Sequence, residues 1–259
     1  MSEINEINNI KAVILAAGQG TRLQSEQSQI PKPMREAAGK PLLHYVLKSI
    51  DFIKDKKDII IVVGYLKEMI MEAFPEHTFV FQEKRLGTGH AVKITHEVLN
   101  DYDGNVLVLL SDMPLVTKET LLNLYREHKE NNNDCTNLSY EINETLALGR
   151  IIRDKNGKFL EIIENRDATE EQKKIIEYNS GNAIFNSKKL FEELANLKNN
   201  NKSGEYYLTD IPKLFMEKNY KVGIYKSENA NEIHGATSEE DLLFIENILK
   251  KNPVQDSAK

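Results

Sequence analysis

Short apolar runs alternate with longer stretches of helical periodicity along the first half of the chain. The apolar runs are β-branched or leucine-rich and end at turn residues, which is typical of buried strands. They are Ala12–Leu15, Ile59–Val63, Phe79–Phe81 and Val106–Leu110. The helical patterns are Leu42–Phe52, Leu66–Phe74, Gly89–Leu99 and Thr117–Lys129. This order predicts an α/β fold with a mostly parallel sheet and helices on both of its faces.

The second half of the chain is less regular. Its expected strands are Thr136–Glu141, Gly149–Arg153, Phe159–Glu164 and Ala183–Phe185. The segment Asp154–Gly157 is a turn signal between two of these strands and predicts a hairpin. The expected helices are Thr169–Ile176, Ser187–Leu197, Tyr207–Glu217 and Ser238–Leu249.

Composition narrows the class of protein. The chain has 259 residues and a net charge of −6, so we expect no general affinity for nucleic acid. Its single cysteine, Cys135, excludes an intramolecular disulfide and a zinc cage built from cysteines. No apolar run is long enough for a membrane helix, and the polar N-terminus does not resemble a secretory signal. We therefore expect a cytoplasmic protein that does not bind membranes.

A glycine-rich segment directly follows the first expected strand and continues to a Pro-Lys-Pro sequence. Its residues are Leu15, Ala16, Ala17, Gly18, Gln19, Gly20, Thr21 and Arg22, and the lysine is Lys32. Glycines at the carboxyl end of a parallel strand let the backbone approach a ligand, and Arg22 and Lys32 can offset the charge of a polyphosphate. The segment is neither a dinucleotide fingerprint nor a P-loop. A tight turn with solvated cations is the structural alternative.

Two further polar segments follow expected strands. In the first, Gln82 can pair with the edge of a base and Gly87 lets a base lie against the backbone. His90 in the same segment is interpreted as a structural residue at a helix start. In the second, Asp112 stands at the carboxyl end of a strand, where a single carboxylate together with substrate phosphates can hold Mg²⁺. A turn or helix-capping aspartate is the alternative.

Polar residues next to glycines recur at strand ends in the second half of the chain. Gly149, Glu164 and Asn179 are placed to hydrogen-bond sugar hydroxyls. Each of them alone is more often a turn residue or a solvated side chain, so only their combination with the earlier segments gives them weight.

Taken in order, these segments resemble the sugar-1-phosphate nucleotidylyltransferases. LAAGQGTR with PKP marks the superfamily. QEKRLGTGHA, LGRI, IIENRDATEEQ, YNSG and GEYYLTDI resemble the uridylyltransferase domain of the bacterial bifunctional enzyme that makes UDP-N-acetylglucosamine. The resemblance covers about Ala12 to Asp241 and implies a Rossmann-like nucleotide-diphospho-sugar transferase fold. Residues 11–236 would form this domain, and residues 237–259 a C-terminal helix with a frayed tail.

The resemblance also implies a reaction and its cofactor. The phosphate of N-acetylglucosamine-1-phosphate would attack the α-phosphorus of UTP in line, pyrophosphate would leave, and Mg²⁺ would be required. The catalytic cations would be Arg22 and Lys32, and the metal ligands Asp112 and Thr237. The substrate-binding residues would be Leu15, Ala16, Ala17, Gly18, Gly20, Gln82, Gly87, Thr88, Ser111, Gly149, Glu164 and Asn179. The uracil would contact Gln82, Gly87 and Thr88.

Four departures from the family pattern stand in the chain. Thr237 replaces the asparagine that is the second metal ligand, and a neutral hydroxyl is a weaker ligand. Ser111 replaces a glycine before the metal aspartate, and Arg85 replaces a glutamine beside the uracil pocket. The loop that contains Gln24–Gln29 is a few residues longer than the pattern.

The sequence leaves several alternatives open. The family's β-helix domain does not follow the last helix, so we expect no acetyl transfer, and a separate acetyltransferase is a candidate partner. The oligomeric state is left open. The same chemistry on another sugar-1-phosphate, or with another pyrimidine nucleotide, is one alternative. A non-catalytic, regulatory nucleotide-sugar-binding domain, motivated by Thr237 and Ser111, is the other.

Overall fold

The computed structural model describes residues 9–18 and 29–252. Within them, one nine-stranded sheet has the order β11-β7-β10-β6-β1-β4-β5, with β8 and β9 joined to it through β10. The strands are β1 Ile10–Ala16, β4 Ile59–Val63, β5 Thr78–Phe81, β6 Asn105–Leu110, β7 Cys135–Glu141, β8 Arg150–Arg153, β9 Phe159–Ile163, β10 Glu177–Asn186 and β11 Val222–Ser227. A separate hairpin pairs β2 Glu36–Ala37 with β3 Lys40–Pro41.

The register of the sheet sets up an edge for a ligand. Strands β1, β4, β5 and β6 are parallel, whereas β10 runs antiparallel to β6 and to β7. The pairing of Leu15 with Leu110 brings the carboxyl ends of β1 and β6 side by side. The expected mixed, mostly parallel sheet is confirmed, and the segments after β1 and β6 meet at one edge.

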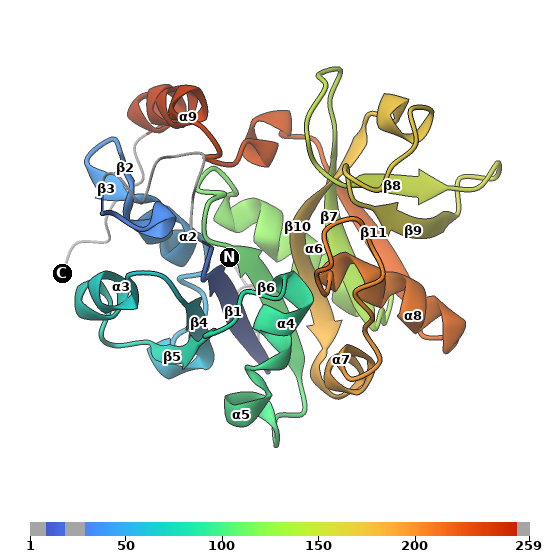
Figure 1. Cartoon of the computed structure of the whole chain (residues 1–259), viewed down its shortest axis with the longest axis horizontal. Helices are drawn as coiled ribbons and strands as arrows, with labels where there is room; N and C mark the ends of the chain where they lie inside the picture. Colours follow the sequence, from blue (N-terminus) through green and yellow to red (C-terminus); the bar gives the residue numbers. More distant parts are fainter. Residues whose placement is uncertain (1–8, 19–28, 253–259) are drawn as a thin grey trace.

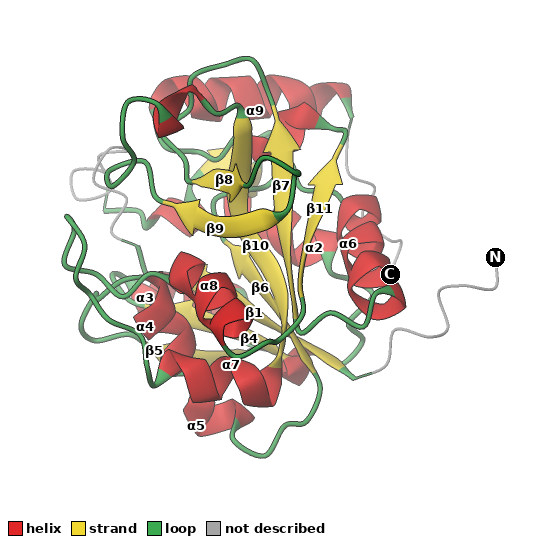
Figure 2. Cartoon of the chain, turned by 90° about the vertical axis from the view of Figure 1, so that its right-hand side faces the viewer, coloured by secondary structure: helices red, strands yellow, loops and turns green. Residues whose placement is uncertain are grey.

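Helices cover both faces of the sheet, as the sequence predicts (Figures 1 and 2). The helices are α2 Leu42–Ser49, α3 Lys67–Ala73, α4 Thr88–Lys93, α5 His96–Leu99, α6 Lys118–Glu130, α7 Ser187–Leu194, α8 Ile211–Glu217 and α9 Glu239–Lys251. In β1, Ala12 and Ile14 face the core shared with α2 and α6, while Val13 faces the core shared with α4, α7 and α8. This alternation is the period of a strand buried on both sides.

The last helix packs away from the main sheet. Leu242, Ile245 and Leu249 of α9 join Ala37 and Leu115 in a smaller buried cluster, and Figure 1 shows α9 beside the β2–β3 hairpin. The division into residues 11–236 and 237–259 stays a prediction. Among the described helices, none combines the length and apolarity that crossing a membrane requires.

Some elements differ from the sequence prediction. The expected helix Thr169–Ile176 is a short 3-10 turn, Gln172–Lys174, which leads into β10. The expected helix Gly89–Leu99 is divided into α4 and α5. Strand β10 begins at Glu177 and therefore includes Asn179, whereas β11 and the β2–β3 hairpin were not expected at all. Strand β11 pairs with β7, which is distant in sequence, and β2 and β3 have two residues each, so local periodicity carries little information about these strands.

Candidate active site

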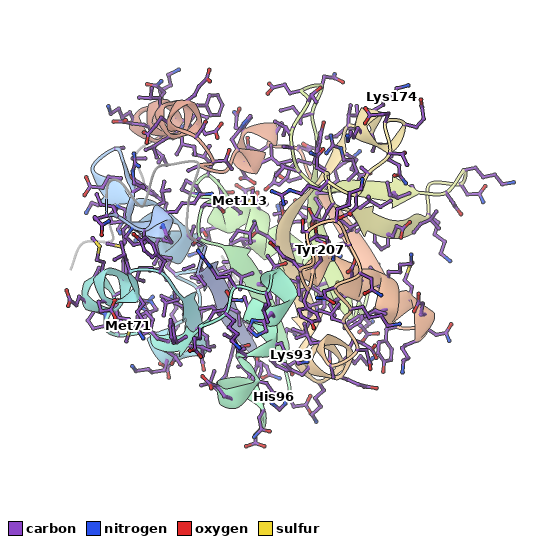
Figure 3. The ribbon with its side chains drawn as sticks, in the orientation of Figure 1. Met71, Lys93, His96, Met113, Lys174 and Tyr207 are labelled. Carbon is purple, nitrogen blue, oxygen red and sulfur yellow. The ribbon has the colours of Figure 1, made fainter. Side chains whose placement is uncertain are left out.

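Two adjoining cavities open at the carboxyl edge of the parallel strands. The larger has a volume of about 500 Å³, and its lining includes Gly18, Lys32, Gln82 and Asp112. The smaller has a volume of about 200 Å³ and is lined by residues of β10 and of the segments around β8 and β9. Leu15, Thr88 and Leu110 line both cavities. In Figure 3, the labelled Met113 and Tyr207 guide the eye to this part of the molecule.

A cation and a carboxylate meet at one end of the larger cavity. Lys32 lies in a 3-10 turn between two prolines, and Asp112 follows β6. Lys32 Nζ donates a hydrogen bond to Asp112 Oδ2, and these side chains are 18% and 23% exposed. The backbone of Asp112 is held in turn, because its carbonyl oxygen accepts from Ala236 N at 2.9 Å. This end therefore presents a positive charge beside an oxygen ligand of the type Mg²⁺ takes.

Thr237 also lines the larger cavity, but its hydroxyl is already engaged. Thr237 Oγ1 donates to Asp241 Oδ2, and the same oxygen accepts from the backbone N–H groups of Thr237 and Ser238 at 3.0 and 2.8 Å. The burial of Asp241 opposes its ionisation, but these hydrogen bonds outweigh it and lower the pKa of the carboxyl. Thr237 thus belongs to the cap of α9 as well as to the cavity.

The opposite end of the larger cavity is shaped by the loop after β5. Gln82 is 5% exposed, and its Nε2 donates to Gly87 O at 3.2 Å. Gly87 has a φ of +105°, and a Cβ there would lie 2.5 Å from Tyr206 O. Tyr206 pairs with this loop, since its N donates to Leu86 O and its O accepts from Gly89 N, both at 2.8 Å. Thr88 Oγ1 accepts from Leu208 N at 3.1 Å, so the GEYYLTDI segment supports the loop.

The smaller cavity contains a buried acceptor without a partner. Asn179 is 5% exposed, and its Oδ1 has no hydrogen-bond partner among the described residues. Its backbone N donates to Gly149 O at 2.9 Å, so β10 lies beside the residue that directly precedes β8. Because an unpaired buried polar atom is costly, the site is suited to a ligand that brings a hydrogen-bond donor.

The carboxylate of Glu164 lines the smaller cavity, and that of Asp210 lies close enough to feel its charge. Burial raises the pKa of Glu164, and the hydroxyl of Thr209, which donates to Glu164 Oε1 at 2.8 Å, opposes this rise. Burial and the neighbouring charge of Glu164 raise the pKa of Asp210 to about 6. Ionising these carboxyl groups is therefore unfavourable in their buried surroundings. The hydroxyl groups of a sugar are suitable neutral hydrogen-bond donors for them.

Comparison with known proteins places this architecture in a family. Residues 11–230 match the family model described as nucleotidyl transferase. The chain belongs to the nucleotidyl transferase family. The resemblance that the motifs indicated is thereby confirmed, and nucleotidyl transfer is the class of reaction of this enzyme family.

Several proteins similar to this nucleotidyl transferase are named bifunctional protein GlmU. The one from Clostridioides difficile (strain 630) is 40% identical over 246 residues, which is 94% of this chain and 52% of the relative. The one from Streptococcus uberis (strain ATCC BAA-854 / 0140J) is 38% identical over 241 residues, or 93% of this chain and 52% of the relative. The chain thus spans about half the length of the curated relatives that it matches.

Solved structures of other proteins share the fold. A putative glucose-1-phosphate thymidylyltransferase from Bacillus anthracis superposes with a TM-score of 0.75 at 18% identity, covering 96% of this chain and 98% of that one. A UDP-glucose pyrophosphorylase complexed with UDP-glucose gives a TM-score of 0.70 at 21% identity, covering 93% and 98%. At these identities the likeness concerns the fold.

The structure brings most of the expected site residues of this nucleotidyl transferase to the two cavities. The larger is lined by Leu15, Ala17, Gly18, Lys32, Gln82, Gly87, Thr88, Ser111, Asp112 and Thr237. The smaller is lined by Gly149, Glu164 and Asn179. Ala16 instead packs in the core at 2% exposure, because its side chain points to the opposite face from Leu15. Gly20, Arg22 and most of Gln24–Gln29 lie outside the described residues.

Three of the departures from the family pattern line the larger cavity: Thr237, Ser111 and Arg85. Ser111 is 5% exposed, and its N donates to Leu15 O at 3.3 Å, so its backbone continues the contact between β1 and β6. Arg85 lies near the Gln82 end. Sequence reasoning missed the supporting role of Tyr206. Its only signal was the aromatic GEYYLTDI segment, within which the expected helix Tyr207–Glu217 begins.

Proposed function

We propose that the chain transfers UMP from UTP to N-acetylglucosamine-1-phosphate, in a Mg²⁺-dependent reaction that releases pyrophosphate. The observation that carries the proposal is the pair of joined cavities. One offers a buried amide and a charged Lys32–Asp112 end, and the other offers the unpaired Oδ1 of Asn179. The relatives named GlmU support the choice of this reaction within the family.

In this proposal, the larger cavity holds UTP. The loop Leu15–Gly18, with Gly20, approaches the nucleotide through its backbone, and Gln82, Gly87 and Thr88 contact the uracil. Arg22 and Lys32 face the phosphates, with Lys32 at the α-phosphate. A cation fixed in a partly buried site stabilises the charge that develops on the phosphoryl group during in-line displacement.

The smaller cavity holds the sugar phosphate. Asn179 Oδ1 accepts from the sugar amide or from a hydroxyl, and Glu164 and the backbone around Gly149 complete the contacts. Placing the two substrates in adjoining cavities turns an encounter of two molecules into a reaction within one complex. This positioning is a large part of what a phosphoryl-transfer enzyme contributes.

The residues at the charged end fit Mg²⁺. Asp112 supplies the carboxylate and the substrate phosphates supply further oxygens, which is how Mg²⁺ is commonly held in such sites. When bound, the ion neutralises phosphate charge. Lys32 contacts the same carboxylate and therefore shares it with the metal. Thr237 is a weak second ligand because its hydroxyl oxygen is neutral; that oxygen keeps its lone pairs while its proton is donated to Asp241.

The test is release of pyrophosphate from UTP and N-acetylglucosamine-1-phosphate, with Mg²⁺ and with a chelator. We expect turnover that requires Mg²⁺. Lys32→Ala and Asp112→Asn should each lower kcat by about 100-fold or more, since each removes charge stabilisation. Lys155→Ala, at the exposed turn between β8 and β9 and outside the lining of both cavities, is the matched control and should keep wild-type kcat. Near wild-type turnover in both site variants would contradict the proposal.

A second candidate keeps the chemistry and changes the substrate. Arg85 at the base end of the larger cavity favours this variation, because the family pattern has glutamine there. Replacing UTP by CTP or dTTP, and the amino sugar by other sugar-1-phosphates, in the same assay separates the two. If the protein binds nucleotide sugars tightly but turns over none of these substrates, it is a binding domain. Thr237 and Ser111, which line the larger cavity and depart from the family pattern, motivate that outcome.

A further inference from the structure

The amide of Gln82 is held in one orientation by two neighbours. Gln82 Nε2 lies 3.2 Å from Gly87 O and 3.0 Å from His90 Nδ1. A carbonyl oxygen only accepts hydrogen bonds, so the contact with Gly87 requires the NH₂ side of the amide there. His90 Nδ1 must then be an acceptor, which fixes neutral His90 in the tautomer protonated at Nε2.

This arrangement leaves one face of the amide for a ligand. Both N–H groups of Gln82 are directed at protein acceptors, and no donor among the described residues bonds its Oε1. The side chain therefore offers an acceptor, and not a donor, to the cavity that it lines. Uracil carries an N–H at position 3, whereas cytosine carries a bare acceptor nitrogen there.

We propose that His90 is a positioning residue that holds the Gln82 amide with Oε1 toward the base, and so selects uracil over cytosine. The inference rests on the proposed function, in which Gln82 contacts the base. His90 does not line the larger cavity; it lies behind Gln82 and lines a separate cavity of about 320 Å³. It acts through Gln82.

The surroundings of His90 keep it neutral. Burial and the charge of Lys93, one turn further along α4 and labelled in Figure 3, lower the pKa of His90 below its usual value of 6.5. Around the separate cavity, α7 presents Leu194, and the segment after it presents Leu197. The segment before α8 contributes Tyr206, which is its only titratable side chain in that lining. The charged residues of the adjoining loop, Glu83, Lys84 and Arg85, are exposed.

Protonation of His90 would disturb this arrangement. A protonated Nδ1 becomes a donor and faces the donor Nε2 of Gln82. If the Gln82 amide flips by 180°, its Oε1 accepts from His90. The flipped amide then loses its hydrogen bond to Gly87 O and directs its N–H groups at the base. Either response weakens the acceptor offered to uracil, and the turned amide instead suits the acceptor nitrogen of cytosine.

The test measures the Kd of UTP and of CTP separately by calorimetry, between pH 5 and 8, at low salt and without the sugar phosphate. The ratio of the two Kd values cancels the titration of the triphosphate, which both nucleotides share. The ratio measured with His90→Leu at the same pH serves as the baseline for protonation of the cytosine ring. In the wild-type protein we expect this preference for UTP to fall about tenfold as the pH drops below 6.5. A tenfold change corresponds to the loss of one well-formed hydrogen bond. Circular dichroism at each pH checks that the protein stays folded.

Two substitutions at His90 separate positioning from packing. Asn can place Oδ1 close to where His90 Nδ1 lies, but it does not titrate in this range. His90→Asn should therefore restore the preference for UTP and make it independent of pH. His90→Leu keeps bulk without an acceptor and should show the reduced preference at every pH. Lys93→Gln should move the wild-type transition to higher pH, because it removes the charge that lowers the pKa of His90.

The outcomes are distinguishable. A preference for UTP that does not change with pH in the wild-type protein, or that survives in His90→Leu, overturns the inference and leaves the proposed function in place. Binding of a purine triphosphate in preference to UTP overturns both.

Discussion

At the scale of single residues, Gly87 shows how close the backbone segments around the base end lie. Its φ of +105° is a conformation that L-residues rarely adopt, and a Cβ would lie 2.5 Å from Tyr206 O and 2.9 Å from Tyr206 N. Gly157 has a similar φ of +81°, but a Cβ there would meet nothing within 4 Å. Alanine at Gly157 would therefore meet backbone strain alone, whereas alanine at Gly87 would meet backbone strain and steric overlap.

We expect Gly87→Ala to destabilise the protein more than Gly157→Ala, which should cost only the strain of about 1 kcal/mol. Gly87→Ala should also raise the Kd of UTP about tenfold or more, because it displaces the loop between Gln82 and Thr88. Thermal unfolding and calorimetric titration measure the two effects. Equal losses of stability in both variants would show that the backbone at Tyr206 shifts with little cost to make room for the Cβ.

Residue types at strand ends could be predicted from the sequence, whereas their hydrogen bonds could not. Lys32, Asp112, Gln82 and Asn179 were expected at one site, and the structure places them around two joined cavities. The position of a residue after a strand follows from topology, which periodicity reveals. The partners of a side chain depend on segments distant in the chain, so neither the link from Gln82 to His90 nor that from Thr237 to Asp241 was visible.

At the scale of elements, α9 depends on its first turn. Ser238 and Asp241 form a capping box, in which each side chain accepts from the other's backbone N–H. The apolar side of the helix covers Ala37 and Leu115. Because the same carboxylate holds Thr237 beside Asp112, the cap joins the stability of α9 to one wall of the larger cavity.

We expect Asp241→Asn to lower the free energy of unfolding by about 1 kcal/mol at pH 7. The pKa of Asp241 is lowered in the folded state, so its stabilising contribution is fully present above its unfolded value of 3.8 and is lost as the pH falls from that value through the lower pKa of the folded state. The difference between wild type and variant should therefore shrink below about pH 4. Denaturant unfolding at pH 7 and pH 3 measures this. Glu240→Gln, in the same helical turn, is the control. A difference of the same size at pH 7 and pH 3 would exclude the carboxylate as its source.

Long elements with strong periodicity were predicted better than short ones. Helix α6 begins where Thr117 predicted, and the Thr117 side chain accepts from Thr120 N at 3.2 Å. Strand β11 was missed, since its residues are only partly buried and it is stabilised by parallel pairing with β7, about 85 residues earlier in the chain. The expected helix Thr169–Ile176 failed because its last residues lead into β10, which the sheet extends.

At the scale of the whole molecule, one buried carboxylate connects the sheet to the C-terminal segments. Glu232 is 1% exposed and accepts from Thr117 at the start of α6, from Tyr140 on β7 and from Asn229. Four residues later, Ala236 N donates to Asp112 O. The chain between Glu232 and Ala236 therefore ties the packing of α6 and β7 to the charged end of the larger cavity.

We expect Glu232→Ala to destabilise the whole protein by about 3 kcal/mol or more, because it leaves several buried donors unpaired at once. For a chain of this size, that loss corresponds to a fall in Tm of about 6–12 °C. Tyr140→Phe is the matched control: it removes one donor and leaves the carboxylate bonded to Thr117 and Thr120, so it should cost about 1 kcal/mol. Scanning calorimetry of both variants measures the difference. If Glu232→Ala costs no more than Tyr140→Phe, water satisfies the abandoned donors, and the carboxylate is not what joins α6, β7 and the segment leading to Ala236.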